Sequence, residues 1–181
     1  MLTLTWKDWR FCLRWILATA IALGFCGFLG IPGLMVGPLV LAIAQGLALK
    51  GYWSRSIFWG FGTVVGGYTA LIAMLGLILI TPAPISLMVF VGSAILGLAQ
   101  AFVLRGTSRF WQWWPPITIA ALLISIGWFV PLAINAGIYG TQRPEWQWIV
   151  LAAMTGLIGG ALKSVALVWF LKQPTRLNRV R

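Results

Sequence analysis

The stretch Leu41-Ala42-Ile43-Ala44-Gln45-Gly46-Leu47-Ala48-Leu49-Lys50-Gly51 has a second copy, Leu96-Gly97-Leu98-Ala99-Gln100-Ala101-Phe102-Val103-Leu104-Arg105-Gly106. Each copy places one amide inside an apolar helix and one cation at its end. A basic and aromatic segment follows both copies, at residues 54–59 and 108–111. Internal similarity of this kind indicates a structural element that the chain uses more than once.

The composition is that of a membrane protein, because 61% of the 181 residues are hydrophobic and only 8% are charged. Apolar stretches long enough to cross the hydrocarbon as helices recur, whereas the short alternating segments of a membrane β-barrel are absent. We therefore expect a single all-α transmembrane domain over residues 1–181. Charges, prolines and glycines divide it into six spans, at about 11–30, 36–50, 57–80, 85–104, 115–134 and 148–171.

The basic residues predict the orientation of this domain. All but two of the thirteen lie on one side of the predicted membrane, and the exceptions are Arg143 and Lys163. Because positively charged loops stay in the cytoplasm, we expect both termini there, with 172–181 as a basic cytoplasmic tail. That tail has four cations and is either a topology anchor or a contact for anionic lipid or an acidic partner.

The repeat predicts three tandem two-helix units of one orientation, related by an axis along the membrane normal. Each odd helix starts at a tryptophan step, and each even helix returns and ends on a cation. In the third unit Gly160-Ala161-Leu162-Lys163 aligns with the segment that ends at Gln100, so Lys163 takes the position of the glutamine. Small-residue pairs such as Gly62 and Gly66 favour close helix packing, within the chain or with another subunit.

The twelve tryptophans gather near the predicted ends of the helices. Indole rings prefer the headgroup level, where the ring is buried and the N–H is hydrated, so we interpret them as interfacial anchors. An alternative is a stacking platform for a pigment or another aromatic ligand. The anchors that we expect are Trp15, Trp59, Trp111, Trp113, Trp114, Trp148 and Trp169.

Gln45, Gln100 and Lys163 are the candidate functional residues. A buried amide needs a partner, so the two glutamines either join the second and fourth helices by a hydrogen bond or form a polar cluster with Lys163 around a shared cavity. Lys163 lies nine residues before Lys172, ~13.5 Å along the helix, where a lysine is usually functional or extends to the headgroup level. We hypothesise that it holds an anionic headgroup or a small anion from the cytoplasmic side.

Several kinds of chemistry are excluded. The chain has no histidine and only two acidic residues, Asp8 and Glu145, which both lie outside the predicted spans. This removes the usual general base, carboxylate pairs and nearly all metal sites, so we expect no enzyme and no cofactor. A glutamine oxygen that ligates chlorophyll, or a bound carotenoid, remains an open alternative. The cations cluster at helix ends, which favours lipid over nucleic acid as a partner.

At the repeated stretch the chain resembles a family of small, mostly cyanobacterial multipass membrane proteins that carry a Gly-Leu-Ala-Gln-Trp-Leu-Val-Leu-Arg phrase before tryptophan-rich helix starts. The resemblance covers residues 41–59 and 96–114, but Gly46 and Ala101 stand where the family has tryptophan. It implies a bacterial inner membrane or a thylakoid membrane. It also suggests association with a photosynthetic complex.

A second resemblance rests on size, six helices and the turn Ile31-Pro32-Gly33-Leu34-Met35-Val36-Gly37-Pro38. In these features the chain is similar to the substrate-binding subunits of energy-coupling-factor vitamin transporters. We therefore expect a non-catalytic accessory or assembly subunit of a larger membrane complex, with membrane-protein partners and anionic lipid at the cytoplasmic face. The alternative is a permease component that binds a small molecule or a lipid.

Overall fold

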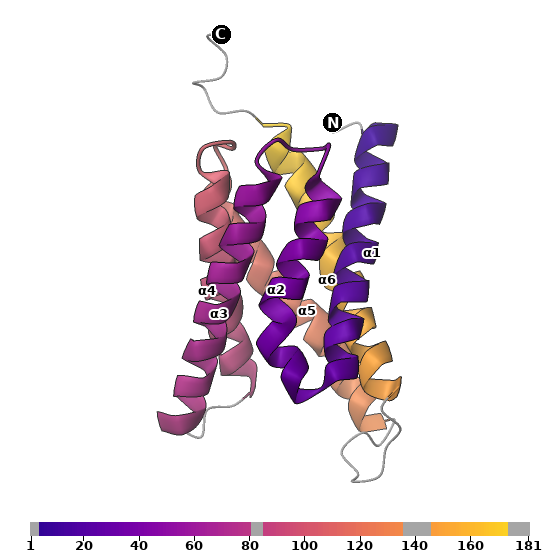
Figure 1. Ribbon diagram of the computed structural model, residues 1–181, viewed down its shortest axis with the longest axis vertical. Coiled ribbons are helices and arrows are strands. Elements are labelled where there is room, and N and C mark those ends of the chain that lie inside the picture. Colours follow the sequence, from indigo (N-terminus) through magenta and orange to yellow (C-terminus); the bar gives the residue numbers. More distant parts are fainter. Residues whose placement is uncertain (1–3, 81–84, 136–145, 174–181) are drawn as a thin grey trace.

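The computed structural model is a bundle of helices and describes residues 4–80, 85–135 and 146–173 (Figure 1). Its helices are α1 (Trp6–Leu29), α2 (Ile31–Leu49), α3 (Ser56–Ile80), α4 (Ile85–Leu104), α5 (Trp114–Asn135) and α6 (Trp146–Leu171), with a short 3-10 helix η1 (Trp111–Trp113) before α5. The described residues contain no β-strand. The prediction of an all-helical fold is confirmed.

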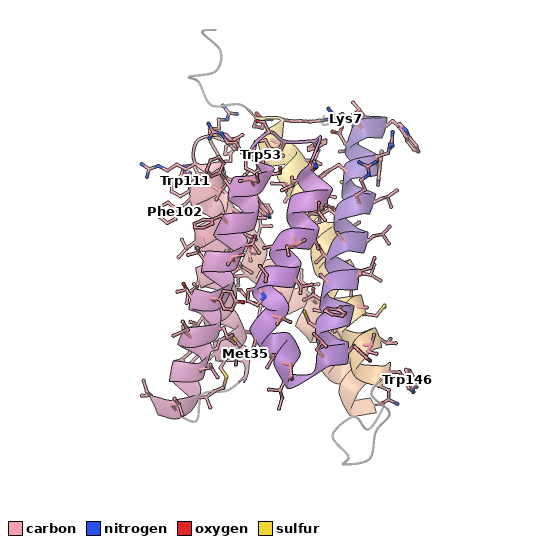
Figure 2. The ribbon with its side chains drawn as sticks, viewed as in Figure 1. Lys7, Met35, Trp53, Phe102, Trp111 and Trp146 are labelled. Carbon is pink, nitrogen blue, oxygen red and sulfur yellow. The ribbon has the colours of Figure 1, made fainter. Side chains whose placement is uncertain are left out.

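Five of these helices, α1 to α4 and α6, contain stretches long and apolar enough to cross a membrane. Many of their large apolar side chains point outward, as Figure 2 shows along the sides of the bundle, and Ile21, Ile72 and Leu79 are among the most exposed. An apolar outer surface is what a bundle presents to lipid, whereas a water-soluble domain covers its helices with polar residues. The protein is thus compatible with an integral membrane location.

The predicted start of the first helix is wrong, because α1 begins at Trp6 and not at residue 11. Thr5 and Asp8 form a capping box, in which each side chain accepts a hydrogen bond from the backbone N–H of the other residue. Such a box satisfies N–H groups that have no partner inside the helix, and so it fixes the helix start. Asp8 therefore lies inside the first helix and not outside it.

The second helix also begins earlier than predicted, at Ile31 instead of residue 36. Pro32 lies in its first turn, where a missing N–H costs no hydrogen bond. Gly30 separates α1 from α2 with a φ of 61°, a left-handed conformation that favours glycine. A one-residue corner thus replaces the loop that the prolines suggested.

The helices form a closed ring, since each packs against the next and α6 packs against α1. The α1–α6 contact is close because α6 presents glycines to it. A Cβ built at Gly156 would lie 2.6 Å from the Cα of Ala20, and one built at Gly160 would lie 3.3 Å from the Cα of Ile16. Gly66 packs in the same way against Ala99 of α4. These small residues therefore serve packing within the chain.

Cations gather at one end of the bundle, where α1, α3 and α5 begin and α2, α4 and α6 end; we call it the basic end. Lys7, Trp53 and Trp111 lie there, whereas Met35 and Trp146 lie at the opposite end (Figure 2). The candidate functional residues all lie in the half of the bundle nearer the basic end.

Candidate functional site

Each buried glutamine accepts a hydrogen bond from the tryptophan fourteen residues later in the chain. The indole Nε1 of Trp59 donates to Oε1 of Gln45 at 3.1 Å, and Nε1 of Trp114 donates to Oε1 of Gln100 at 2.9 Å. All four side chains are at most 2% exposed. The glutamine–tryptophan bond therefore joins α2 to α3 and, a second time, α4 to α5.

One of our two interpretations was that the glutamines join the second and fourth helices by a hydrogen bond. This interpretation is wrong. Gln45 is bonded to α3, while Gln100 is bonded to α5 and also donates from Nε2 to Oγ1 of Thr63 on α3 at 2.9 Å. Both amide oxygens are buried, and each accepts an indole N–H. Nor does any hydrogen bond link either glutamine to Lys163 in the described part of the chain.

Three of the expected interfacial anchors are instead part of the core. Trp15, Trp59 and Trp114 are each 0% exposed. The ring of Trp59 contacts both of the others edge-on, with centroids 5.6 Å from Trp15 and 5.2 Å from Trp114. An indole that is wholly enclosed by helices does not contact lipid headgroups. Trp15, Trp59 and Trp114 thus belong to one core cluster near the basic end of the bundle.

The other expected anchors lie closer to the surface. Trp113 is 56% exposed, Trp111 and Trp169 are half-buried, and the side chain of Trp148 lies outside the described part. The guanidinium of Arg105 lies 5.7 Å from the ring centre of Trp111, and Trp169 stacks on Phe110 at 4.9 Å. These positions at the basic end match an interfacial role.

Lys163 is 9% exposed and makes no hydrogen bond or ion pair with any described residue. Four other buried groups have no hydrogen-bond partner among the described residues, namely Nε1 of Trp15 and Oγ1 of Thr19, Thr107 and Thr118. Leaving a buried polar group unpaired costs stability, and leaving a buried charge unpaired costs more. Lys163 therefore marks the least satisfied part of the interior.

Asp8 is a buried polar residue that the sequence analysis missed. It is 2% exposed, accepts from the hydroxyl of Tyr52 at 2.7 Å, and forms an ion pair with Lys172. Burial and this hydrogen bond raise the pKa of Tyr52 above its ordinary value. Asp8 thus joins α1 to the α2–α3 loop and to the end of α6. The Thr5-x-x-Asp8 spacing is the signal that identifies it.

Several apolar grooves open on the outer surface, and two of them are large. The larger, of 800 Å³, lies between α5 and α6. The other, of 750 Å³, lies between α3 and α4, and Arg55 lies at its basic end. The α3–α4 groove is lined by Arg55, Phe58, Phe61, Gly62, Val65, Gly66, Thr69, Ile95, Ala99, Phe102, Val103 and Gly106. Such grooves accept acyl chains or the side chains of another helix.

The remaining site chemistry is limited. Among the described residues no three acids, cysteines or histidines lie close enough to hold a metal ion. Comparisons with protein-family models, with curated proteins and with solved structures find no match. The functional conclusion therefore rests on the geometry of the bundle.

Proposed function

We propose that the protein is a non-catalytic integral membrane subunit that holds an anionic lipid in the groove between α3 and α4. In this proposal α5 also crosses the membrane, which gives six spans in three two-helix units. The basic end faces the cytoplasm together with both termini. The single observation that carries the proposal is the guanidinium of Arg55 at the head of an apolar groove.

The topology is supported by the positions of the described cations. Lys50 and Arg105 follow the even helices α2 and α4, and Arg55 precedes α3. Lys172 follows α6 and reaches Asp8 on α1. Positive residues at membrane boundaries stay on the cytoplasmic side, so one basic end implies one cytoplasmic end.

The lipid assignment follows from the arrangement of charge above apolar surface. A Cβ built at Gly106 would lie 2.6 Å from a guanidinium nitrogen of Arg55, so this side chain lies over the α4 end of the groove. Below it the groove is floored by Gly62, Gly66 and Ala99. An acyl chain fits such a floor, and a phosphate at headgroup level pairs with the guanidinium. A cation near an anionic membrane surface contributes about 1 kcal/mol of attraction.

Native mass spectrometry of the protein in a mild detergent tests the proposal. We expect one anionic phospholipid per chain to survive a detergent exchange that removes zwitterionic lipid. Arg55→Gln removes the guanidinium and should lose that lipid. Arg109→Gln is the matched control, because Arg109 is an exposed arginine at the same end that lies over Phe110 and outside the groove. If both variants retain the lipid equally, the groove is not the site.

The groove between α5 and α6 favours a second function, assembly with another membrane protein. Its lining contains no charged residue, and Leu4 and Trp169 stand at its basic end. An apolar helix from a partner subunit fits such a surface better than a lipid headgroup does. We expect the wild type to migrate on blue native gels as an assembly larger than the single chain. Ala120→Trp fills this groove, so this variant should lose the larger assembly while its lipid retention stays unchanged. Equal migration of variant and wild type would exclude this surface.

A further inference from the structure

The alignment of the repeats assigns Lys163 to the position of Gln100, with α6 and α1 in place of α4 and α5. The packing of the helices at two glycines supports this assignment. A Cβ at Gly97, three residues before Gln100, would lie 2.8 Å from Pro115 and 3.1 Å from Thr118. Pro115 directly follows Trp114, and Thr118 lies four residues after it.

The same register exists between α6 and α1. A Cβ at Gly160, three residues before Lys163, would lie 3.3 Å from Ile16 and 3.4 Å from Thr19. Ile16 directly follows Trp15, and Thr19 lies four residues after it. Trp15 therefore has the same position relative to Lys163 that Trp114 has relative to Gln100. In the α4–α5 pair that relation brings Nε1 to 2.9 Å from the glutamine oxygen.

The packing of α6 against α5 near Lys163 also matches the packing of α4 against α3 near Gln100. Gln100 donates to Thr63, and near this bond a Cβ at Gly66 would lie 3.3 Å from the Cα of Leu96. In the α5–α6 pair, Gly159 takes the place of Leu96, and a Cβ there would lie 3.9 Å from the backbone oxygen of Ala121. Ala121 follows Thr118 by three residues, as Gly66 follows Thr63. Thr118 is thus the counterpart of Thr63 beside Lys163.

The substitution changes the chemistry of this position. A glutamine offers both an oxygen that accepts and an NH₂ that donates, whereas a lysine ammonium only donates. Trp15 Nε1 is a donor as well, and it has no acceptor among the described residues. The third contact therefore brings two donors and one positive charge together. The unpartnered groups beside them are the neutral hydroxyls of Thr19 and Thr118, which can accept a hydrogen bond but carry no negative charge.

Asp8, the one acid in the described part of the chain, does not supply a negative charge to this contact. It already accepts from Tyr52 and Thr5 and pairs with Lys172. No other acid is present on α1, α5 or α6 within the described ranges. A buried cation without an acidic partner favours an external counter-ion.

We propose that Lys163, Trp15 and Thr118 form a binding site for a small anion. The ligand is a single anionic acceptor of halide size that receives a hydrogen bond from the ammonium and from the indole N–H, and it replaces the missing amide oxygen. A free halide and one phosphate oxygen of a lipid share this chemistry. The position of Lys163, about 13.5 Å along α6 from Lys172, favours a small ion over a headgroup.

Thermal unfolding in neutral detergent at constant ionic strength tests this site, with chloride or bromide exchanged for gluconate, an anion too large for it. We expect the midpoint of wild-type unfolding to rise with halide, by about 3–5 °C at ten times the dissociation constant. Lys163→Gln provides the amide of the other two copies and should remove this response. Trp15→Phe should weaken halide binding roughly 3–10-fold.

Arg14→Gln is the control, because it removes an exposed cation beside Trp15 and should leave the halide response intact. A parallel titration with dioctanoyl phosphatidylglycerol in gluconate identifies the source of the acceptor. A higher unfolding midpoint with halide identifies the ligand as a free ion. A higher midpoint with this lipid alone identifies it as a headgroup, provided that Lys163→Gln abolishes the increase.

The proposal is overturned if neither halide nor lipid stabilises the wild type, or if Lys163→Gln responds as the wild type does. If neither ligand stabilises the wild type, Lys163 itself is the acceptor, because the lone pair of an uncharged amine can receive the hydrogen bond of Trp15 Nε1. Failure here leaves the lipid groove at Arg55 untouched, because that site is measured by lipid retention in a different variant.

Discussion

Replacing Gln100 with leucine removes two buried hydrogen bonds at nearly constant side-chain volume. Trp114 Nε1 loses its acceptor and Thr63 Oγ1 loses its donor, and both groups are 0% exposed. Interhelical hydrogen bonds in membrane proteins contribute ~0.6 kcal/mol on average and up to ~1.7 kcal/mol. Two such bonds predict a loss of roughly 1–3 kcal/mol in the free energy of unfolding.

Reversible unfolding in mixed dodecylmaltoside and dodecyl sulfate micelles, followed by circular dichroism, measures this loss. Gln112→Leu is the matched control, since Gln112 is exposed in η1 and its replacement should change the free energy of unfolding by less than about 0.5 kcal/mol. A double-mutant cycle with Trp114→Phe separates the hydrogen bond from the cavity that the smaller ring leaves.

The cycle should give a coupling of about 0.6–1.7 kcal/mol between Gln100 and Trp114. Additive effects of the two substitutions would refute the reasoning, because they would mean that the indole–amide bond contributes nothing to stability. Equal losses for Gln100→Leu and Gln112→Leu would refute it as well.

Three further predictions concern the basic end and the helix contacts. Lys172→Met leaves Asp8 buried without its cation and should lower the free energy of unfolding by about 1.5–3 kcal/mol, and chemical denaturation should show that adding Asp8→Asn recovers part of this loss. Folding raises the pKa of Tyr52, so its protonated hydroxyl contributes to the free energy of unfolding. This contribution is fully present below about pH 10 and is lost as the pH rises toward the folded-state pKa. An alkaline series of unfolding measurements should therefore show a steeper decline for the wild type than for Tyr52→Phe. Gly156→Ala places a methyl group 2.6 Å from the backbone of α1 and should cost about 1–3 kcal/mol, whereas Gly76→Ala meets no atom within 4 Å and should be neutral or stabilising on the same measurement.

The fold was largely predictable because helix length in a membrane follows from runs of apolar residues. Predicted and observed bounds agree within two residues for α3 to α6. The starts of α1 and α2 differed because local capping decided them. Thr5 and Asp8 extend α1 beyond the apolar run, and Gly30 makes a corner in which a proline is tolerated.

The candidate site was predicted less completely, because the sequence shows how far along a helix a residue lies but not which face it occupies. Trp113 and Trp114 are neighbours in sequence, yet one is 56% exposed and the other is fully buried. Both tryptophans lie close to basic residues in the sequence, which predicts an interfacial anchor at each position. The spacing of fourteen residues between glutamine and tryptophan, present in both copies, is the signal that distinguishes Trp59 and Trp114 from the exposed tryptophans.

The central claim is that Lys163 holds the position of a glutamine facing Trp15. The free energies of unfolding of Lys163→Gln and Lys163→Met, compared in halide-free medium, test it most directly. The amide oxygen of the glutamine variant can accept from Trp15 Nε1, whereas the methionine sulfur accepts only weakly, so we predict that the glutamine variant is more stable by about 0.6–1.7 kcal/mol. This difference should vanish when Trp15 is replaced by phenylalanine. Equal stability of the two variants with Trp15 intact would contradict the account.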